Sequence, residues 1–311
     1  MEALKNQAQE VVDFSVANIT NGLYQLSQKK ADAYFNATNE LYDMYVAAAE
    51  HIIENDLFFD VGVPFNLIEI IKKSWENDVH WHIYGSFSFN ENLKLLGFNA
   101  DSPDYLYETA LLQYETLKTN GIDEEKQFNE VYEKISTNFK RLITLFNDTS
   151  EFEENYDNWK ILFSSLAENT EDERAVQFLQ QMAEDAGFKT GFEFLENTVF
   201  SEDGISDREE NEYEYWYKHY SWTDMSYNEP ELLTTLTNII DNQKAIILNP
   251  AYTAIFEAKG ILKVLRDLYP NSPYLDEEGS TEYQANVFFA YEACGIGFIN
   301  EQNEFIGHTL V

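Results

Sequence analysis

The sequence predicts an α/β protein with a helical N-terminal section, and three observations support this class. Helical apolar spacing dominates residues 3–80. A strand, helix and strand follow one another over 159–195, which is the pattern of a parallel crossover unit. Short apolar segments typical of buried strands recur at 245–249 and after residue 284. Hydrophobic residues make up 44% of the chain, which supports a sizeable core and excludes a disordered protein.

Apolar spacing and turn residues locate the elements of the first half of the chain. Gly62 and Pro64 interrupt the N-terminal helical pattern, so a break is expected around them. Farther along, apolar and polar residues alternate on either side of Asn90-Glu91-Asn92, which is typical of a hairpin. In chain order we expect helix over most of 3–80 with a break at 58–66, a helix at 67–78, a hairpin over 81–99, and helices over 104–119 and 125–146.

The second half of the chain opens with the crossover unit. The stretch WKILFSSL is a candidate buried strand, and a helix follows it in which Thr170 and Glu173 form a capping box and Gly187 is the stop signal. Pro270 ends a later helix. The remaining expectations are a strand or turn at 188–195, an exposed acidic loop at 202–214, a helix at 230–241, a strand at 245–249, a helix at 254–270, a polar linker at 276–282, and two or three strands from 285 onward.

The charge balance is strongly acidic. Asp and Glu number 56 against 20 Lys and Arg, which gives a formal net charge of −36. Phosphate contacts need clustered Lys and Arg, so direct nucleic-acid binding is not expected. The charge favours cationic partners such as polyamines, metal ions or basic proteins. Two alternatives stay open: a solvated surface adapted to salt or crowding, and a DNA mimic.

Cysteine and hydropathy patterns restrict the location. Cys294 is the only cysteine, so an internal disulfide is excluded, and its apolar surroundings favour a buried, inert thiol. The N-terminus lacks a basic-then-apolar leader, and no apolar run is long enough to span a bilayer. We therefore expect a cytoplasmic protein with no membrane partner. A phage-encoded or virion-associated protein is included in the expectation of a component of a larger assembly.

Searches for general catalytic signatures find little. There is no phosphate-binding glycine loop, dinucleotide fingerprint or Gly-x-Ser-x-Gly elbow. His80 and His82 would point the same way on a strand and could bind a metal, but no cysteine or third histidine accompanies them. A partly exposed strand pair is the alternative. Carboxylates are so abundant that a pair of them is weak support for acid–base chemistry.

Four segments together resemble the glutathionylspermidine synthase family, whose synthetase domain has an ATP-grasp-like architecture. They occur in the family's order and cover most of the chain. The segments are YGSFSF…LKLLGFNADSPDYLYET (84–109), LFSSLAENTEDERAVQFLQQMAEDAGFKT (162–190), ILNPAYTAIFEAKGILKVLRDLYPNSPYL (247–275) and ACGIGFINEQNEFIGHTLV (293–311). The resemblance implies a truncated ATP-grasp-like scaffold: a helical section over 1–80 and an α/β core over 81–311, together one compact unit.

The resemblance also implies a chemistry, joining a glutathione carboxylate to a spermidine amine with ATP and Mg²⁺. This chain departs from the family pattern where that chemistry is done. Ser86 replaces the hairpin Arg, Ser88 and Gly97 replace the Asp and Glu that hold Mg²⁺, and Ile299 replaces a C-terminal Arg; Asn99 is the one metal-ligand position that is retained. Asn249 stands where the family has a Glu, and the lysine-bearing lid that covers the nucleotide is missing between 275 and 283. Loss of one charge-stabilising donor costs about 10²–10³ in rate, so these losses together should abolish ligation.

Four further positions match residues near the family's glutathione and polyamine pockets. They are Ser102, Glu171, Asp172 and Lys259. Each also has an ordinary structural explanation, as a turn residue, a first-turn helix acid or a surface charge. The expected function is a catalytically inactive relative that acts in binding, scaffolding or assembly through its acidic surface, with a basic protein or polyamine as partner and no cofactor. The alternatives are an active ATP- and Mg²⁺-dependent carboxylate–amine ligase, and a polyamine- or glutathione-binding module without turnover.

Overall fold

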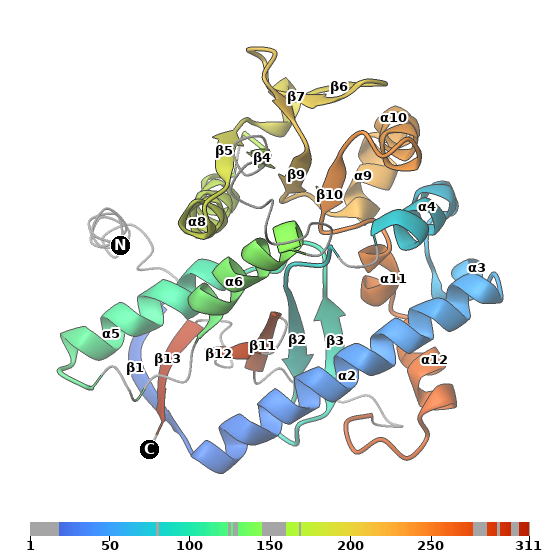
Figure 1. Ribbon diagram of the computed structural model, residues 1–311. Helices are drawn as coiled ribbons and strands as arrows, with labels where there is room; N and C mark the ends of the chain where they lie inside the picture. The colour runs from blue at the N-terminus through green and yellow to red at the C-terminus, as the bar shows by residue number, and fades with distance from the viewer. Residues whose placement is uncertain are drawn as a thin grey trace.

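The computed structural model describes residues 19–78, 81–123, 126, 130–144, 160–167, 169–275, 285–290, 293–299 and 305–310. Their strands form a six-stranded mixed sheet, a four-stranded parallel sheet and a small three-stranded antiparallel sheet. Helices pack against the two larger sheets (Figure 1). The predicted α/β class is confirmed, and no helix among the described residues is both long and apolar enough to cross a membrane.

The six-stranded sheet joins the two ends of the described chain. Its strands, in spatial order, are β1 (Ile19–Leu26), β13 (Phe305–Leu310), β12 (Ala293–Ile299), β11 (Ala285–Ala290), β2 (Gly85–Phe89) and β3 (Leu95–Asn99). β1 runs parallel to β13, and the other neighbours are antiparallel. The expected strands near the C-terminus are confirmed. The helical expectation is wrong for 19–26, because this segment pairs with a strand from the far end of the chain and that pairing overrides the local pattern.

The long helix α2 (Gln28–Glu54) covers one face of the β2–β3 hairpin. Ser27 caps it by accepting a hydrogen bond from the Lys30 amide. Tyr45 contacts the rings of Phe87 and Phe98, and those two phenyl rings stack at 3.9 Å between centroids. The strand alternation predicted for the hairpin therefore places its phenylalanines toward α2 and leaves the intervening polar positions on the other face.

The first half of the chain contains further helices, two of which pack against the six-stranded sheet. The expected break around Gly62 and the helix after it are confirmed. α6 contacts β11 and β12, and α5 contacts β13. The elements are α3 (Phe58–Val61), a 3-10 turn (Phe65–Leu67), α4 (Ile68–Asp78), a π-helical turn η2 (Glu108–Leu112), α5 (Gln113–Thr119) and α6 (Val131–Thr144).

The crossover unit is confirmed in the four-stranded sheet. Its order is β10 (Ile246–Leu248), β9 (Tyr215–Lys218), β4 (Lys160–Ser164) and β5 (Lys189–Phe192), all parallel, and α8 (Thr170–Ala186) connects β4 to β5. Gly187 ends α8 with a left-handed φ of 103°, as its glycine permits. The N-cap is Asn169 rather than Thr170, since the Asn169 side chain accepts hydrogen bonds from the amides of Glu171 and Asp172.

Two other expectations are corrected in this half. The acidic stretch 202–214 is not all loop, because β7 (Gly204–Ser206) and β8 (Glu212–Tyr213) form a small sheet with β6 (Val199–Ser201). The helix expected over 254–270 is two helices, α11 (Thr253–Glu257) and α12 (Ile261–Leu268), which follow α9 (Trp222–Asn228) and α10 (Pro230–Asp241). The interruption spans residues 258–260 and begins at Ala258, whose backbone is extended with a ψ of 121°. The Gly260 amide donates to the Val61 carbonyl, and a Cβ added to Gly260 would clash with the Val61 backbone. The linker expected at 276–282 lies outside the described residues.

Candidate functional site

The β2–β3 hairpin brings four of the sequence-selected positions together. Ser86 lies opposite Asn99, and Ser88 lies opposite Gly97 in the antiparallel register. Ser86 is buried, Asn99 is half-buried, and a Cβ added at Gly97 would meet no atom within 4 Å. Ile299 is the last residue of β12, where it pairs with Phe305 of β13, two strands away from the hairpin.

The donor set of this hairpin does not suit Mg²⁺. The Asn99 Oδ1 atom is buried and has no hydrogen-bond partner among the described residues, whereas its Nδ2 atom donates to the Ser102 carbonyl at 3.3 Å. Mg²⁺ prefers near-octahedral oxygen ligands that include carboxylates. The hairpin offers one amide oxygen and two hydroxyl groups. Gly97 contributes no side chain, and no atom lies within 4 Å of where its Cβ would be. These residues therefore do not fit a Mg²⁺ site.

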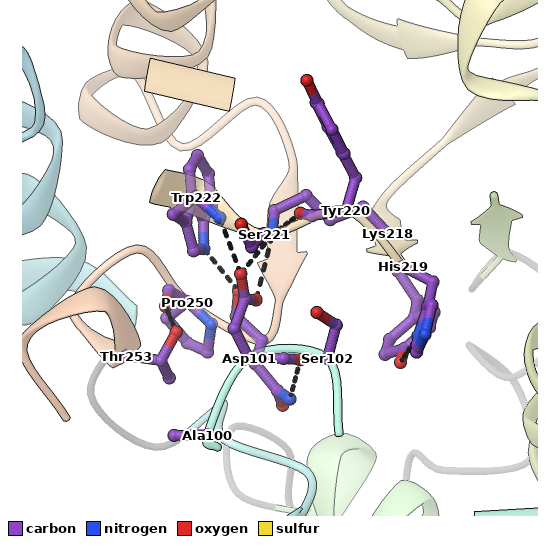
Figure 2. Close-up of polar contacts among 12 residues, drawn as sticks. Ala100, Asp101, Ser102, Lys218, His219, Tyr220, Ser221, Trp222, Pro250 and Thr253 are labelled. Carbon is purple, nitrogen blue, oxygen red and sulfur yellow. Dashed lines mark hydrogen bonds and ion pairs between the residues drawn. The ribbon is translucent and has the colours of Figure 1, made fainter. Parts of the chain in front are cut away.

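A buried charge centre lies just past the hairpin. Asp101 and Lys218 are fully buried, and both Asp101 carboxylate oxygens accept hydrogen bonds from Lys218 Nζ at 2.9 Å. The Trp222 amide also donates to Asp101 Oδ2 at 2.8 Å, and Lys218 Nζ lies 4.3 Å from the centre of the Trp222 ring (Figure 2). Glu257 Oε1 accepts from the amides of Ala100 and Asp101. The centre thus ties the end of β3, the end of β9 and α11 together.

The electrostatics of this centre follow from burial. Desolvation raises the pKa of Asp101, and the Lys218 ammonium opposes that rise. Desolvation lowers the pKa of Lys218, and Asp101 and Glu257 oppose that fall. Burial and the Asp101 charge raise the pKa of Glu257 to about 8. Among the described residues Lys218 Nζ bonds to Asp101 and not to Glu257, and a pKa of about 8 leaves Glu257 mainly protonated at neutral pH.

Four carboxyl groups form a second feature, which we call the acidic cluster: Asp104, Glu108, Glu171 and Asp172. Asp104 follows β3, Glu108 lies in η2, and the other two occupy the first turn of α8. Desolvation, with the charges of Asp104 and Glu171, raises the pKa of Asp172 to about 6. Desolvation and the Glu171 charge raise the pKa of Asp104, which is an exposed residue. The cluster concentrates negative charge at one place in the fold.

Buried His219 borders the acidic cluster at the end of β9. Its Nε2 atom lies 3.6 Å from Asp172 Oδ1, and single donor atoms of Asp104, Asp172 and His219 lie within 4.8 Å of one another. The His219 Nδ1 atom is 3.3 Å from the Tyr217 hydroxyl, which in turn is 3.0 Å from the Tyr84 hydroxyl. Desolvation, aided by the Lys218 charge, lowers the pKa of His219 to about 4, so the imidazole is neutral at physiological pH.

Comparison with known proteins identifies the family. The model of the glutathionylspermidine synthase pre-ATP-grasp family matches residues 13–278. The chain belongs to this family. A provisionally named acid–amine ligase of Haemophilus influenzae is 24% identical over 93% of this chain and 76% of its own length. The bifunctional glutathionylspermidine synthetase/amidase of Escherichia coli is 23% identical over 92% of this chain and 49% of its own length, so the chain spans about half of that relative.

A solved structure supports the fold independently. The apo form of a glutathione synthetase-like effector from Globodera pallida superposes with a TM-score of 0.54 at 8% identity, covering 100% of this chain and 97% of the effector. At that identity the likeness concerns the fold alone. It agrees with the ATP-grasp-like scaffold expected from the family resemblance.

Within this glutathionylspermidine synthase scaffold, the predicted ligand positions are only partly brought together. Glu171 and Asp172 meet in the acidic cluster, and half-buried Ser102 lies between the hairpin and that cluster along the chain. Lys259 is exposed in the turn between α11 and α12, and among the described residues no hydrogen bond or ion pair links it to the other three. Their role in binding stays a prediction.

Two other sequence candidates have structural roles. His82 Nε2 is 2.8 Å from the Ala100 carbonyl oxygen and its Nδ1 is 3.1 Å from the Tyr42 hydroxyl, so both ring nitrogens are engaged; His80 lies outside the described residues. Buried Asn249 accepts from the Ile83 amide and donates to the Asp101 carbonyl, which fastens β10 to the hairpin. Sequence reasoning missed Lys218 and His219, whose signal was a charged residue and a histidine at the end of the apolar strand YWYKH.

Proposed function

We propose that this member of the glutathionylspermidine synthase family does not carry out ATP-dependent ligation and instead works by binding a partner. The observation that carries the proposal is the composition of the β2–β3 hairpin, in which Ser86, Ser88 and Gly97 supply no charge. Phosphoryl transfer depends on cations and positioned donors that neutralise the developing negative charge. A hairpin with one amide oxygen as its retained ligand offers none of these.

The proposed partner is cationic. A net charge of −36 attracts a basic protein or a polyamine at long range, and it opposes contact with nucleic-acid phosphates. A role as a scaffolding or structural component of a larger assembly follows from the same acidic surface. Neither role requires ATP or Mg²⁺.

The test combines thermal unfolding with a measurement of nucleotide turnover. The proposal expects no rise in Tm with ATP and Mg²⁺ and no ADP release when glutathione and spermidine are present. It also expects a rise in Tm with the cationic partner, because a ligand that binds only the folded state stabilises it. ADP release together with an ATP-dependent rise in Tm would establish the alternative, an active carboxylate–amine ligase.

A restored variant provides the matched control. The double substitution Ser88→Asp and Gly97→Glu returns two carboxylates to facing positions, and the open space beside Gly97 can accept the larger side chain. We expect this variant to bind Mg²⁺ measurably more tightly than the parent chain. Equal Mg²⁺ affinity in the two proteins would mean that the residues of the hairpin do not determine Mg²⁺ binding, and the proposal would lose its main support.

The acidic cluster favours a second candidate function, a polyamine-binding module without turnover. Glu171 and Asp172 lie with Asp104 and Glu108 in mutual electrostatic contact, and the raised pKa values of Asp104, Glu108 and Asp172 result from burial and from one another's charge. Ammonium groups would relieve that repulsion. Spermidine-dependent stabilisation that disappears in Glu171→Gln and persists without ATP would support this function.

A further inference from the structure

Three potential metal ligands converge from three separate segments. Asp104 comes from the loop after β3, Asp172 from the first turn of α8, and His219 from the end of β9. One donor atom of each lies within 4.8 Å of the other two. Among the described residues, this is the arrangement that combines an imidazole nitrogen with two carboxylates at such distances.

The Nδ1 atom of His219 orients the imidazole ring through a contact with Tyr217. The ring is 6% exposed, and its Nδ1 atom lies 3.3 Å from the Tyr217 hydroxyl. When Nδ1–H donates to that hydroxyl, the Tyr217 hydroxyl can in turn donate a hydrogen bond to the Tyr84 oxygen 3.0 Å away. The lone pair of Nε2 then faces the carboxylates. Metal-binding histidines are oriented in the same way, by a hydrogen bond from the nitrogen that does not bind the ion.

The separation between Nε2 and the nearest carboxylate oxygen distinguishes the possible occupants. At 3.6 Å the two atoms are too far apart for a good hydrogen bond. Two ligands of a tetrahedral ion with bonds of about 2.0–2.1 Å stand roughly 3.3–3.4 Å apart. Two acceptors of one ammonium group, with hydrogen bonds of about 2.8 Å, would stand roughly 4.6 Å apart. The distance between His219 and Asp172 is close to the metal value, whereas the separations that involve Asp104, bounded at 4.8 Å, are compatible with either occupant.

We propose that Asp104, Asp172 and His219 form a binding site for one divalent transition-metal ion. The imidazole selects such an ion over Mg²⁺ or Ca²⁺, which prefer all-oxygen ligands. Asp104 is exposed and can rotate to complete the site, and three protein ligands leave a position for water. The inference goes beyond the proposed function, since neither a cationic partner nor the loss of ligation requires a metal. It also differs from the hairpin positions that the family resemblance assigns to Mg²⁺.

The first experiment titrates Zn²⁺ into the whole chain against a chromophoric chelator. Excess Mg²⁺ is kept in the buffer, because a chain with net charge −36 binds divalent ions weakly at many carboxylates and Mg²⁺ will occupy those sites. We expect one Zn²⁺ per chain that Mg²⁺ does not displace. Co²⁺ in place of Zn²⁺ should show visible absorption bands that report bound nitrogen and oxygen ligands.

Matched variants separate the site from the general acidic surface. His219→Gln and Asp104→Asn should each weaken Zn²⁺ binding by at least about tenfold, and Tyr217→Phe by about tenfold through loss of ring orientation. Glu173→Gln, in the same turn of α8 but outside the three-residue site, should leave Zn²⁺ affinity unchanged. Asp104 is exposed, so its variant keeps the measurement decisive if a buried variant unfolds.

Two results would overturn the proposal. One is Zn²⁺ affinity that is the same in the parent, His219→Gln and Asp104→Asn proteins, or that is abolished by Mg²⁺. The other is spermidine binding that displaces Zn²⁺ and is lost in Asp172→Asn but retained in His219→Gln, which would assign the carboxylates to an amine instead.

Discussion

Replacement of Asp101 by asparagine tests the buried charge centre most directly. Asp101 and Lys218 are both 0% exposed, and the carboxylate receives two hydrogen bonds of 2.9 Å from the ammonium group. Removing one partner of a buried ion pair costs about 3–5 kcal/mol of unfolding free energy. Asparagine retains an oxygen for the Trp222 amide, and Glu257 can ionise to compensate Lys218 in part. We therefore expect a loss near the lower end, about 3 kcal/mol.

Urea unfolding at neutral pH measures this loss, together with Lys218→Met and the double variant. Lys218→Met leaves Asp101 without its ammonium partner, whereas the double variant removes both charges. The double variant should be much less destabilised than the sum of the single ones, because the partners interact directly. If the single losses add to within about 0.5 kcal/mol, or if Asp101→Asn costs less than about 1 kcal/mol, the pair does not interact as the structure indicates.

Three further predictions concern other positions. Burial raises the pKa of Glu257 to about 8 from an ordinary 4.5, so between these pH values the folded state holds a proton that the unfolded state has lost. The unfolding free energy should therefore fall as pH rises through this interval, by at most about 1.4 kcal/mol per pH unit. Urea unfolding of Glu257→Gln at several pH values should show a smaller fall, and an unchanged slope would contradict this. Gly260→Ala should lower the unfolding free energy by about 1–3 kcal/mol because the new methyl carbon would clash with the Val61 backbone. Gly97→Ala, with open space around it, should be nearly neutral in the same calorimetric scan. Asn169→Ala should cost about 1 kcal/mol through loss of the α8 cap, and a Tm equal to that of the parent would exclude the capping role.

Local patterns predicted the elements whose signals are local. The crossover unit has a helix stop at Gly187 and apolar strands on both sides, and the hairpin has its turn at Asn90, whose side chain accepts from the amides of Asn92 and Lys94. The strand β1 was missed because it is stabilised by pairing with β13, which lies almost 280 residues later in the sequence and leaves no local signal. The break before α12 was missed because it occurs at Ala258, a residue type that favours helix, so the local sequence contains no stop signal there.

For the candidate site, the sequence indicated which family residues are replaced, but it did not indicate which other residues come together. The identities of Ser88 and Gly97 led to the expectation of no metal cage, which stays a prediction, and the register shows that these two positions face one another. The meeting of Asp104, Asp172 and His219 could not be anticipated, because it depends on how the four-stranded sheet sits against the loop after β3. In so acidic a sequence, nothing marked Asp104 as a possible metal ligand.

The order of strands in the six-stranded sheet has a consequence for synthesis on the ribosome. All strands of the parallel sheet lie before residue 249, so that sheet can assemble while the chain is still growing. β1 and the β2–β3 hairpin, made much earlier, must wait for β11–β13 to emerge. Contacts that span so much of a chain form slowly, and unpaired strand edges invite association with other chains. We expect nascent chains of this protein to depend on chaperones until β13 has been synthesised.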